Sequence, residues 1–136
     1  PHPGEMARLT GLATLEIQSR RREVAADFAK LHGVYLVLKG AATVIAAPDG
    51  RLAVNATGNP GMASGGMGDV LAGLIGGLLA QGVPPWEASC LGAYVHGLAA
   101  DRLVRAGQPF GFLASELAAE IPAAFREVLD FAVSDS

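Results

Sequence analysis

The pattern of apolar and polar positions predicts a succession of helices and strands in this chain. From Glu16 to Leu31, apolar residues recur at helical spacing and Gly33 follows as a C-terminal stop, which predicts an amphipathic helix. The five consecutive apolar residues 34–38 then predict a strand buried on both faces, as in a parallel sheet. A helix followed by a buried strand indicates an α/β fold.

Turn-forming residues divide the rest of the chain into further elements. The opening "PHPGEMARLTG" is punctuated by Pro and Gly, which predicts a loop. The stretch "TVIAAPDGRLAVN" predicts two short strands joined by a turn at 48–50, as a hairpin at the sheet edge, because Asp-Gly adopts the positive φ angles of tight turns. Helices are predicted over 69–80, about 86–105 and about 115–129, and Pro122 must begin a new helix or kink the last one.

Composition narrows the class of protein. With 136 residues, 51% of them apolar, the chain is sized for one domain with a buried core. Its net charge of −3 gives no electrostatic reason to expect a nucleic-acid partner. The single cysteine, Cys90, excludes an intramolecular disulfide and a structural zinc cluster and fits the cytoplasm. No apolar run is long enough to span a bilayer, so we expect no membrane partner.

The segment "NATGNPGMASGGMGDVLAGLIGGLLAQG" combines many glycines with one charged residue, Asp69. A helix N-terminus presents unpaired N–H groups and a positive dipole end, which together bind phosphate. In "GGMGD", Gly65, Gly66 and Gly68 would let backbone N–H groups face a phosphate directly. Asp69, at the start of the same helix, would accept a proton from a substrate hydroxyl as that oxygen attacks phosphorus.

A structural interpretation of this segment stays open beside the catalytic one. Asp69 would then only cap the helix, and the glycines would only serve close packing. Within the helix, Gly73, Gly76 and Gly77 are expected to let another backbone approach. Other phosphate motifs do not apply, because the chain has neither GxxxxGK[ST] nor a GxGxxG that opens a helix after a strand.

Three stretches, "PHPGE", "LKGAATVIAAPDG" and "NATGNPGMASGGMGDVLAGLIGGLLAQG", in this order, resemble the carbohydrate-kinase-like domain of ADP-dependent NAD(P)H-hydrate dehydratases, a ribokinase-like family. The resemblance extends through Asp101. It implies a layered α/β sheet with flanking helices, of which residues 1–136 form only the C-terminal half. A chain without the other half would expose apolar surface, so we expect a homo-oligomer with weak or no activity of its own.

The resemblance implies nicotinamide nucleotide repair by a hydro-lyase. The S epimer of hydrated NADH or NADPH would be dehydrated to NADH or NADPH while ADP, or ATP in its place, is consumed, with release of AMP and phosphate from ADP. Mg²⁺ is the implied ion, with unknown ligands. By analogy with kinases, Asp69 would deprotonate the ring hydroxyl, which would be phosphorylated and then eliminated as phosphate. The alternatives are an ATP-dependent kinase of a vitamin precursor or sugar, which would share "GGMGD", and a noncatalytic nucleotide-binding fragment.

Site residues follow from the matched motifs. His2 and Asp69 match positions that contact the hydrated dinucleotide. Positions that contact the adenine nucleotide are matched by Lys39, Gly40, Ala41, Ala42, Thr43 and Gly68, with Gly65 and Gly66 beside them. The polar residues Asn55, Thr57 and Asn59 are weaker candidates, which would donate to phosphate or bind Mg²⁺ through water, or else satisfy the backbone of a tight loop. Structural roles are expected for Trp86, Cys90, His96 and Asp101.

Overall fold

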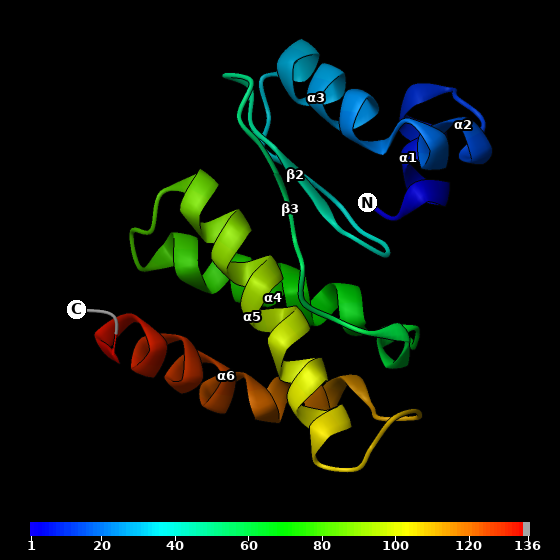
Figure 1. Cartoon of the computed structure of the whole chain (residues 1–136). Helices are drawn as coiled ribbons and strands as arrows, with labels where there is room; N and C mark the ends of the chain where they lie inside the picture. The colour runs from blue at the N-terminus through cyan, green and yellow to red at the C-terminus, as the bar shows by residue number, and fades with distance from the viewer. Residues whose placement is uncertain (135–136) are drawn as a thin grey trace. The chain divides into compact units, whose positions relative to one another are not determined.

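A computed structural model describes residues 1–134 of the chain (Figure 1). The chain forms two compact units, which we describe separately. Unit 1 comprises residues 1–56 and 84–90, and unit 2 comprises residues 57–83 together with the described residues from 91 onward. No helix among residues 1–134 has both the length and the apolarity needed to cross a bilayer.

Unit 1 begins with a helix where the sequence predicted a loop. Helix α1 spans Pro3–Thr10, and His2 occupies its N-cap position. His2 Nδ1 accepts hydrogen bonds from the N–H groups of Gly4 and Glu5, at 3.1 and 3.3 Å, while the Glu5 carboxylate accepts from the His2 N–H at 2.8 Å. This reciprocal pair is a capping box, with proline at the first helical position. The prediction of a loop was therefore wrong, because Pro3 starts a helix here.

The helix predicted from Glu16 to Leu31 is two helices in the structure. Helix α2 spans Thr14–Ser19 and helix α3 spans Arg21–His32. They are separated by Arg20, whose φ of −128° and ψ of 35° are not helical. Gly33 ends α3 as predicted, with a φ of 64° and its N–H bonded to the Ala29 carbonyl. The apolar spacing continues across Arg20, so periodicity alone did not reveal the break.

The sheet of unit 1 has three strands in the order β1-β2-β3. Their bounds are Leu36–Leu38, Val44–Ala46 and Leu52–Val54. Both pairings are antiparallel, so the expectation of a parallel sheet was wrong, although β1 does lie within the predicted apolar run. The β2–β3 hairpin is confirmed: Gly50 in its turn has a φ of 96°, and β3 lies at the sheet edge.

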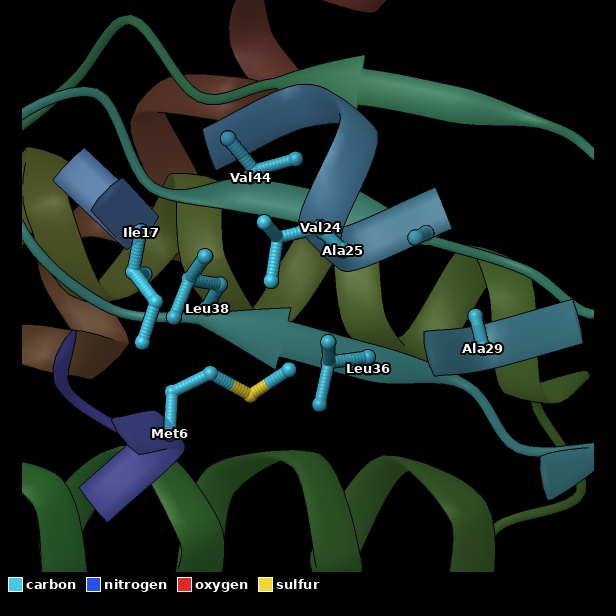
Figure 2. Close-up of a cluster of buried hydrophobic side chains, with 9 residues drawn as sticks. Met6, Ile17, Val24, Ala25, Ala29, Leu36, Leu38 and Val44 are labelled. Carbon is cyan, nitrogen blue, oxygen red and sulfur yellow. The ribbon is translucent and has the colours of Figure 1, made fainter. Parts of the chain in front are cut away.

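The core of unit 1 lies between this sheet and the helices before it. Figure 2 shows its buried apolar side chains, with Met6 from α1, Ile17 from α2 and Val24 from α3 gathered against Leu36 and Leu38 of β1. Each helix thus contributes an apolar side chain to one cluster. The cluster fixes the end of β1, after which the candidate nucleotide-binding turn begins.

Unit 2 is helical. It contains the short 3₁₀ helix η1 over Pro60–Met62, α4 over Met67–Ala80, most of α5, which spans Pro85–Arg105, and α6 over Ala114–Ser134. The three predicted helices are therefore confirmed within a few residues at each end. Helix α6 continues through Pro122 rather than restarting there. A second apolar cluster, from α4, α5 and α6 and the segments between them, forms the core of this unit.

The glycines inside α4 do not serve the close packing that the sequence predicted. A Cβ atom added at Gly73, Gly76 or Gly77 would meet no atom of the described residues of unit 2 within 4 Å. All three positions are exposed. The prediction of an approaching backbone is therefore wrong for these residues in this structure.

Candidate functional site

The predicted site residues are divided between the two units. Unit 1 holds His2, the turn Lys39–Thr43 and Asn55, whereas unit 2 holds Thr57, Asn59, Gly65, Gly66, Gly68 and Asp69. Each unit therefore presents its own group of candidate residues, and we examine the two groups in turn.

In unit 1, the structure brings the "PHPGE" and "KGAAT" motifs together. The Lys39 N–H donates to the Pro1 carbonyl at 2.8 Å, and Lys39 Nζ lies 3.9 Å from Glu5 Oε2. Glu5 Oε1 lies 3.4 Å from His2 Nε2. The His2 N–H, and after it the Lys39 charge, lower the pKa of the Glu5 carboxyl. Two segments that are far apart in the sequence thus form one polar surface that carries His2 and Lys39.

The turn Lys39–Thr43, called the KGAAT turn below, joins β1 to β2. Two of its residues have left-handed backbone angles, Gly40 with a φ of 142° and Ala42 with a φ of 57°. Thr43 Oγ1 donates to the Gly40 carbonyl at 3.1 Å, which ties the turn across itself. The Asn55 N–H donates to the Thr43 carbonyl at 2.8 Å. Asn55 therefore lies beside the KGAAT turn, and these predicted residues form one group.

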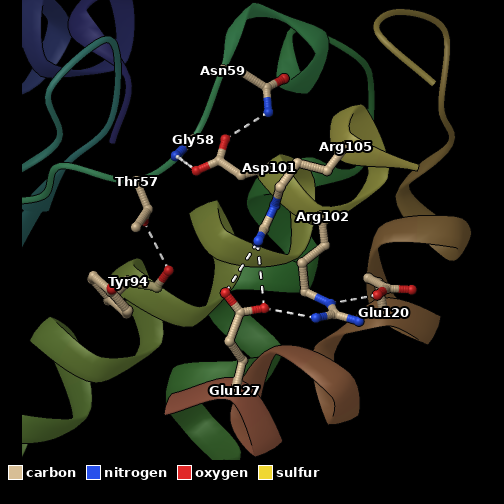
Figure 3. Close-up of polar contacts among 9 residues, drawn as sticks. All are labelled: Thr57, Gly58, Asn59, Tyr94, Asp101, Arg102, Arg105, Glu120 and Glu127. Carbon is tan, nitrogen blue, oxygen red and sulfur yellow. Dashed lines mark hydrogen bonds and ion pairs between the residues drawn. The ribbon is translucent and has the colours of Figure 1, made fainter. Parts of the chain in front are cut away.

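In unit 2, the segment 57–59 is fastened to α5 (Figure 3). Asp101 accepts two hydrogen bonds through its carboxylate, from the Gly58 N–H at 2.9 Å and from Asn59 Nδ2 at 2.8 Å. Thr57 Oγ1 donates to the Tyr94 carbonyl at 2.8 Å, and Asn59 Oδ1 accepts from the Gly61 N–H at 3.0 Å. Thr57 and Asn59 thus support the loop backbone, as the structural interpretation of these residues expects. Their binding of phosphate or Mg²⁺ stays a prediction.

Two residues of α5 make this attachment possible, and sequence reasoning did not give either of them that role. Asp101 supplies the carboxylate, and Gly97 supplies the space. A Cβ at Gly97 would lie 2.6 Å from the carbonyl carbon of Thr57, so only glycine lets this segment lie against the helix. The two residues are four apart and hence on one helix face, which is the signal in "HGLAAD" that could have found them.

The "GGMGD" stretch forms the start of α4. Gly66 is the N-cap residue with a φ of 85°, and Asp69 is exposed in the first turn. The cap position thus belongs to Gly66, so the interpretation of Asp69 as the N-cap residue does not describe this helix. The first N–H groups of α4 belong to Met67, Gly68 and Asp69, which is the arrangement that an anion site at a helix N-terminus requires.

His96 lies beneath the same turn. It is buried, and its Nε2 lies 3.0 Å from the Met67 carbonyl. The expectation that His96 is a packed residue agrees with this position.

One cleft of unit 1 lies away from the predicted site residues. This cleft, of about 320 Å³, is lined mainly by α1, α2 and α3, with Leu9, Val24 and Phe28 among its apolar walls, and it contains none of the predicted site residues. Within residues 1–134, no three His, Cys, Asp or Glu side chains are grouped to hold a metal ion.

Comparison with known proteins decides the family. Residues 1–123 match the family described as NAD(P)H-hydrate dehydratase. The chain belongs to this family. It is 49% identical over 128 residues to the bifunctional NAD(P)H-hydrate repair enzyme of Moorella thermoacetica, a match that covers 94% of this chain and 24% of that protein. It is 48% identical over 119 residues to the ADP-dependent (S)-NAD(P)H-hydrate dehydratase of Neisseria meningitidis, covering 87% of this chain and 40% of that protein.

Solved structures agree with the family assignment. The ADP/ATP-dependent NAD(P)H-hydrate dehydratase of Bacillus subtilis, co-crystallised with ATP/Mg²⁺, is 39% identical and has a TM-score of 0.90, over 93% of this chain and 46% of that one. A ribokinase-like superfamily protein of Enterococcus faecalis is 33% identical with a TM-score of 0.73. The predicted family and α/β fold class are thereby confirmed. The chain spans less than half the length of these dehydratase relatives.

Proposed function

We propose that residues 1–136 are the C-terminal part of a dehydratase domain whose activity is nicotinamide nucleotide repair. The reaction is the ADP-dependent dehydration of the S epimer of hydrated NADH or NADPH, with release of AMP and phosphate. The observation that carries this proposal is the 48% identity over 119 residues to the ADP-dependent (S)-NAD(P)H-hydrate dehydratase of Neisseria meningitidis. The contact between "PHPGE" and "KGAAT" supports it, because it joins the segments expected to bind the two substrates.

The proposed chemistry uses α4. Asp69 accepts the proton of the ring hydroxyl while that oxygen attacks the terminal phosphorus of ADP and AMP leaves. The N–H groups of the first turn of α4 stabilise the negative charge on the transferred group. Phosphate then departs from the ring, and loss of a ring proton restores the double bond. Transfer is useful because phosphate is a much better leaving group than hydroxide.

The nucleotide is proposed to bring the metal ion with it. Mg²⁺ commonly binds proteins through one or two carboxylates and otherwise through phosphate oxygens and water. Because Asp69 is the proposed proton acceptor, the ion is proposed to bind through the phosphate oxygens and water. The ion would neutralise charge on the nucleotide phosphates. Either ADP or ATP is the proposed co-substrate, in keeping with the name of the Bacillus subtilis relative.

The chain by itself is expected to show weak or no turnover and to self-associate. It spans 40% of the Neisseria meningitidis dehydratase, so the rest of that domain's surface has no counterpart in this chain. The curated relatives are named for hydrate repair, which favours this reaction over the kinase alternative.

The test places this sequence in a complete domain. Residues 1–123 would replace the matching residues of the Bacillus subtilis dehydratase, and the recovery of reduced nicotinamide absorbance would be followed with hydrated NADH, ADP and Mg²⁺. We expect turnover, and we expect Asp69→Asn to lower the rate by roughly 10²- to 10⁴-fold. The control is Asp27→Asn, at an exposed position of α3, which should leave the rate unchanged. A stable phosphorylated product without recovered absorbance would contradict the proposal and favour a kinase.

A further inference from the structure

Arg21 reaches from the start of α3 to the beginning of the KGAAT turn. Its Nη2 donates to the Leu38 carbonyl at 2.9 Å and to the Lys39 carbonyl at 3.2 Å. Its Nη1 donates to Gln18 Oε1 at 2.9 Å, which holds the guanidinium from the side of α2. Arg21 therefore connects the break between two helices with the end of a strand seventeen residues further on.

Gly40 fits closely against this side chain. A Cβ added at Gly40 would lie 2.9 Å from Arg21 Nη1, and the φ of 142° is itself a conformation that other residues rarely adopt. Two local features thus favour glycine at position 40 of the "KGAAT" motif: the backbone angle and the nearby guanidinium of Arg21. The KGAAT turn therefore packs closely against the Arg21 side chain at Gly40.

Among the described residues, no carboxylate forms an ion pair with the Arg21 guanidinium. All of its hydrogen-bond acceptors among residues 1–134 are carbonyl or amide oxygens, and its Nε is buried with no partner there. Burial lowers the pKa of the guanidinium. A partly buried arginine without an ion pair gives up some hydration that no carboxylate replaces, and its contacts with the turn point to a role in shaping that turn.

Peptide geometry shows what these contacts achieve. A trans peptide unit directs its C=O and N–H in opposite directions. In the Leu38–Lys39 unit, the carbonyl accepts from Arg21 and the N–H donates to Pro1, so both sides are fixed. In the Lys39–Gly40 unit, the carbonyl accepts from Arg21, and the Gly40 N–H must point away from it. Gly40 is exposed, and its N–H has no acceptor among residues 1–134.

We propose that Arg21 is a positioning residue that turns the Gly40 N–H outward as a hydrogen-bond donor to the adenine nucleotide. This inference rests on the proposed function for the identity of the ligand. Arg21 does not touch the nucleotide; it acts through the Lys39–Gly40 peptide. An oxygen atom of the nucleotide is the chemical group that would accept from this N–H.

The first arm of the test measures the turn without any nucleotide, in the 136-residue chain. Amide hydrogen exchange is followed in Arg21→Met, Arg21→Lys and Arg22→Met, the last being an exposed neighbour that serves as the matched control. We expect Arg21→Met to speed exchange of the Lys39 amide by roughly tenfold or more, since the charge-assisted hydrogen bond that holds its peptide unit is lost. Arg21→Lys should restore part of the protection, and Arg22→Met should change nothing. Unchanged Lys39 exchange in Arg21→Met, with core amides still protected, would overturn the proposal.

The second arm titrates ADP into the same four proteins by calorimetry. We expect Arg21→Met to weaken ADP binding by roughly tenfold to a hundredfold, with Arg21→Lys in between and Arg22→Met equal to the unaltered chain. A faster Lys39 exchange with unchanged ADP affinity would overturn the role of Arg21 while leaving the proposed function intact. Equal weakening in Arg21→Met and Arg22→Met would overturn it too. Lack of ADP binding by the unaltered chain and by the complete hybrid domain would contradict the proposed function itself, and the role of Arg21 with it.

Discussion

The two candidate loops are held by side chains of opposite charge. In unit 1, Arg21 donates to carbonyl groups at the start of the KGAAT turn, whereas in unit 2, Asp101 accepts from the Gly58 N–H and the Asn59 amide. A cation beneath a loop occupies acceptors and leaves N–H groups available, but an anion takes the N–H groups away. For a phosphate-bearing ligand, which needs donors, the two attachments therefore have different consequences.

This difference separates two kinds of predicted residue. The KGAAT turn keeps a donor directed outward and is suited to contact an anion. In the segment 57–59, the Thr57 hydroxyl, the Gly58 N–H and the Asn59 side-chain amide donate to Tyr94 and Asp101, so these three donors support the loop that leads to the glycines at the start of α4. Within unit 2, the anion site is thus expected at residues 65–69 rather than at 57–59.

The largest expected effect comes from removing the space that the unit 2 attachment requires. In Gly97→Val, the new side chain would collide with the backbone of Thr57, and we expect a loss of about 4 kcal/mol in the free energy of unfolding. Urea denaturation measures it. Gly76→Val is the matched control, because it also puts valine in a helix but meets no atom of unit 2 within 4 Å. Equal losses in the two variants would mean that Gly97 does not seat the loop.

The second largest effect is expected from removing the Asp101 carboxylate in unit 2. Asp101→Ala leaves the Gly58 N–H and the Asn59 amide without their acceptor, and we expect a loss of about 2 to 3 kcal/mol in stability. Asp101→Asn keeps one acceptor oxygen and should lose less. Hydrogen exchange at Gly58 should rise in both variants, more in Asp101→Ala. Protection that survives in Asp101→Ala would show that Thr57 and Gly97 suffice to hold the loop.

A third comparison isolates the fit between Gly40 and Arg21. Gly40→Ala and Gly50→Ala both force alanine into a positive φ, but only at Gly40 does the new Cβ meet another side chain. We expect losses of about 1 kcal/mol at Gly50 and about 2 kcal/mol at Gly40. Thermal or urea unfolding gives both values. Adding Arg21→Met to Gly40→Ala should relieve the excess, and a purely additive double variant would argue against the contact.

A small effect of opposite sign is expected on the outer face of α4. Gly76→Ala should stabilise the chain by about 0.5 to 1 kcal/mol, because alanine favours the helix and meets no atom of unit 2 within 4 Å. The close packing predicted from the sequence would instead make this variant less stable. The sign of the change in urea midpoint therefore distinguishes the two interpretations.

The smallest expected effect is on the stability of the chain at acidic pH. Arg102, and after it Arg105, lower the pKa of Glu127 in the ion-pair network of Figure 3. A carboxyl with a lowered folded-state pKa contributes stability that is fully present above its ordinary value of 4.5 and is lost as the pH falls through the lower value. The group is partly exposed, so the contribution should stay below about 1 kcal/mol. Glu127→Gln should flatten this part of the stability profile between neutral and acidic pH.

Local sequence signals predicted the elements whose chemistry is local. The turn at Gly50 and the end of α3 at Gly33 both follow from glycine and its backbone freedom. Helix α4 begins at Met67, two residues before the predicted start, because Gly66 rather than Asp69 is its N-cap residue. The family could also be predicted from the sequence, since its longest motif lies in one uninterrupted stretch. The sequence did not predict that β1 pairs in an antiparallel direction, because a short apolar run has the same pattern in parallel and antiparallel sheets.

Contacts between distant segments explain the rest. A helix N-cap formed by His2 escaped prediction because histidine is not among the preferred N-cap residues and Pro3 resembled loop punctuation. Arg21 and Asp101 each act on a segment far away in the sequence, through hydrogen bonds that no spacing rule encodes. Charged residues in a helical pattern are expected to face solvent, which hid both roles.

The capping of α1 also determines the tautomer of His2. Because Nδ1 accepts from two backbone N–H groups, the neutral ring carries its proton on Nε2. The edge of the imidazole opposite the cap is therefore a donor, and it faces Glu5 Oε1 at 3.4 Å. One oxygen of Glu5 thus completes the cap at the His2 N–H while the other faces the ring, so a ligand that accepts from Nε2 must compete with this carboxylate.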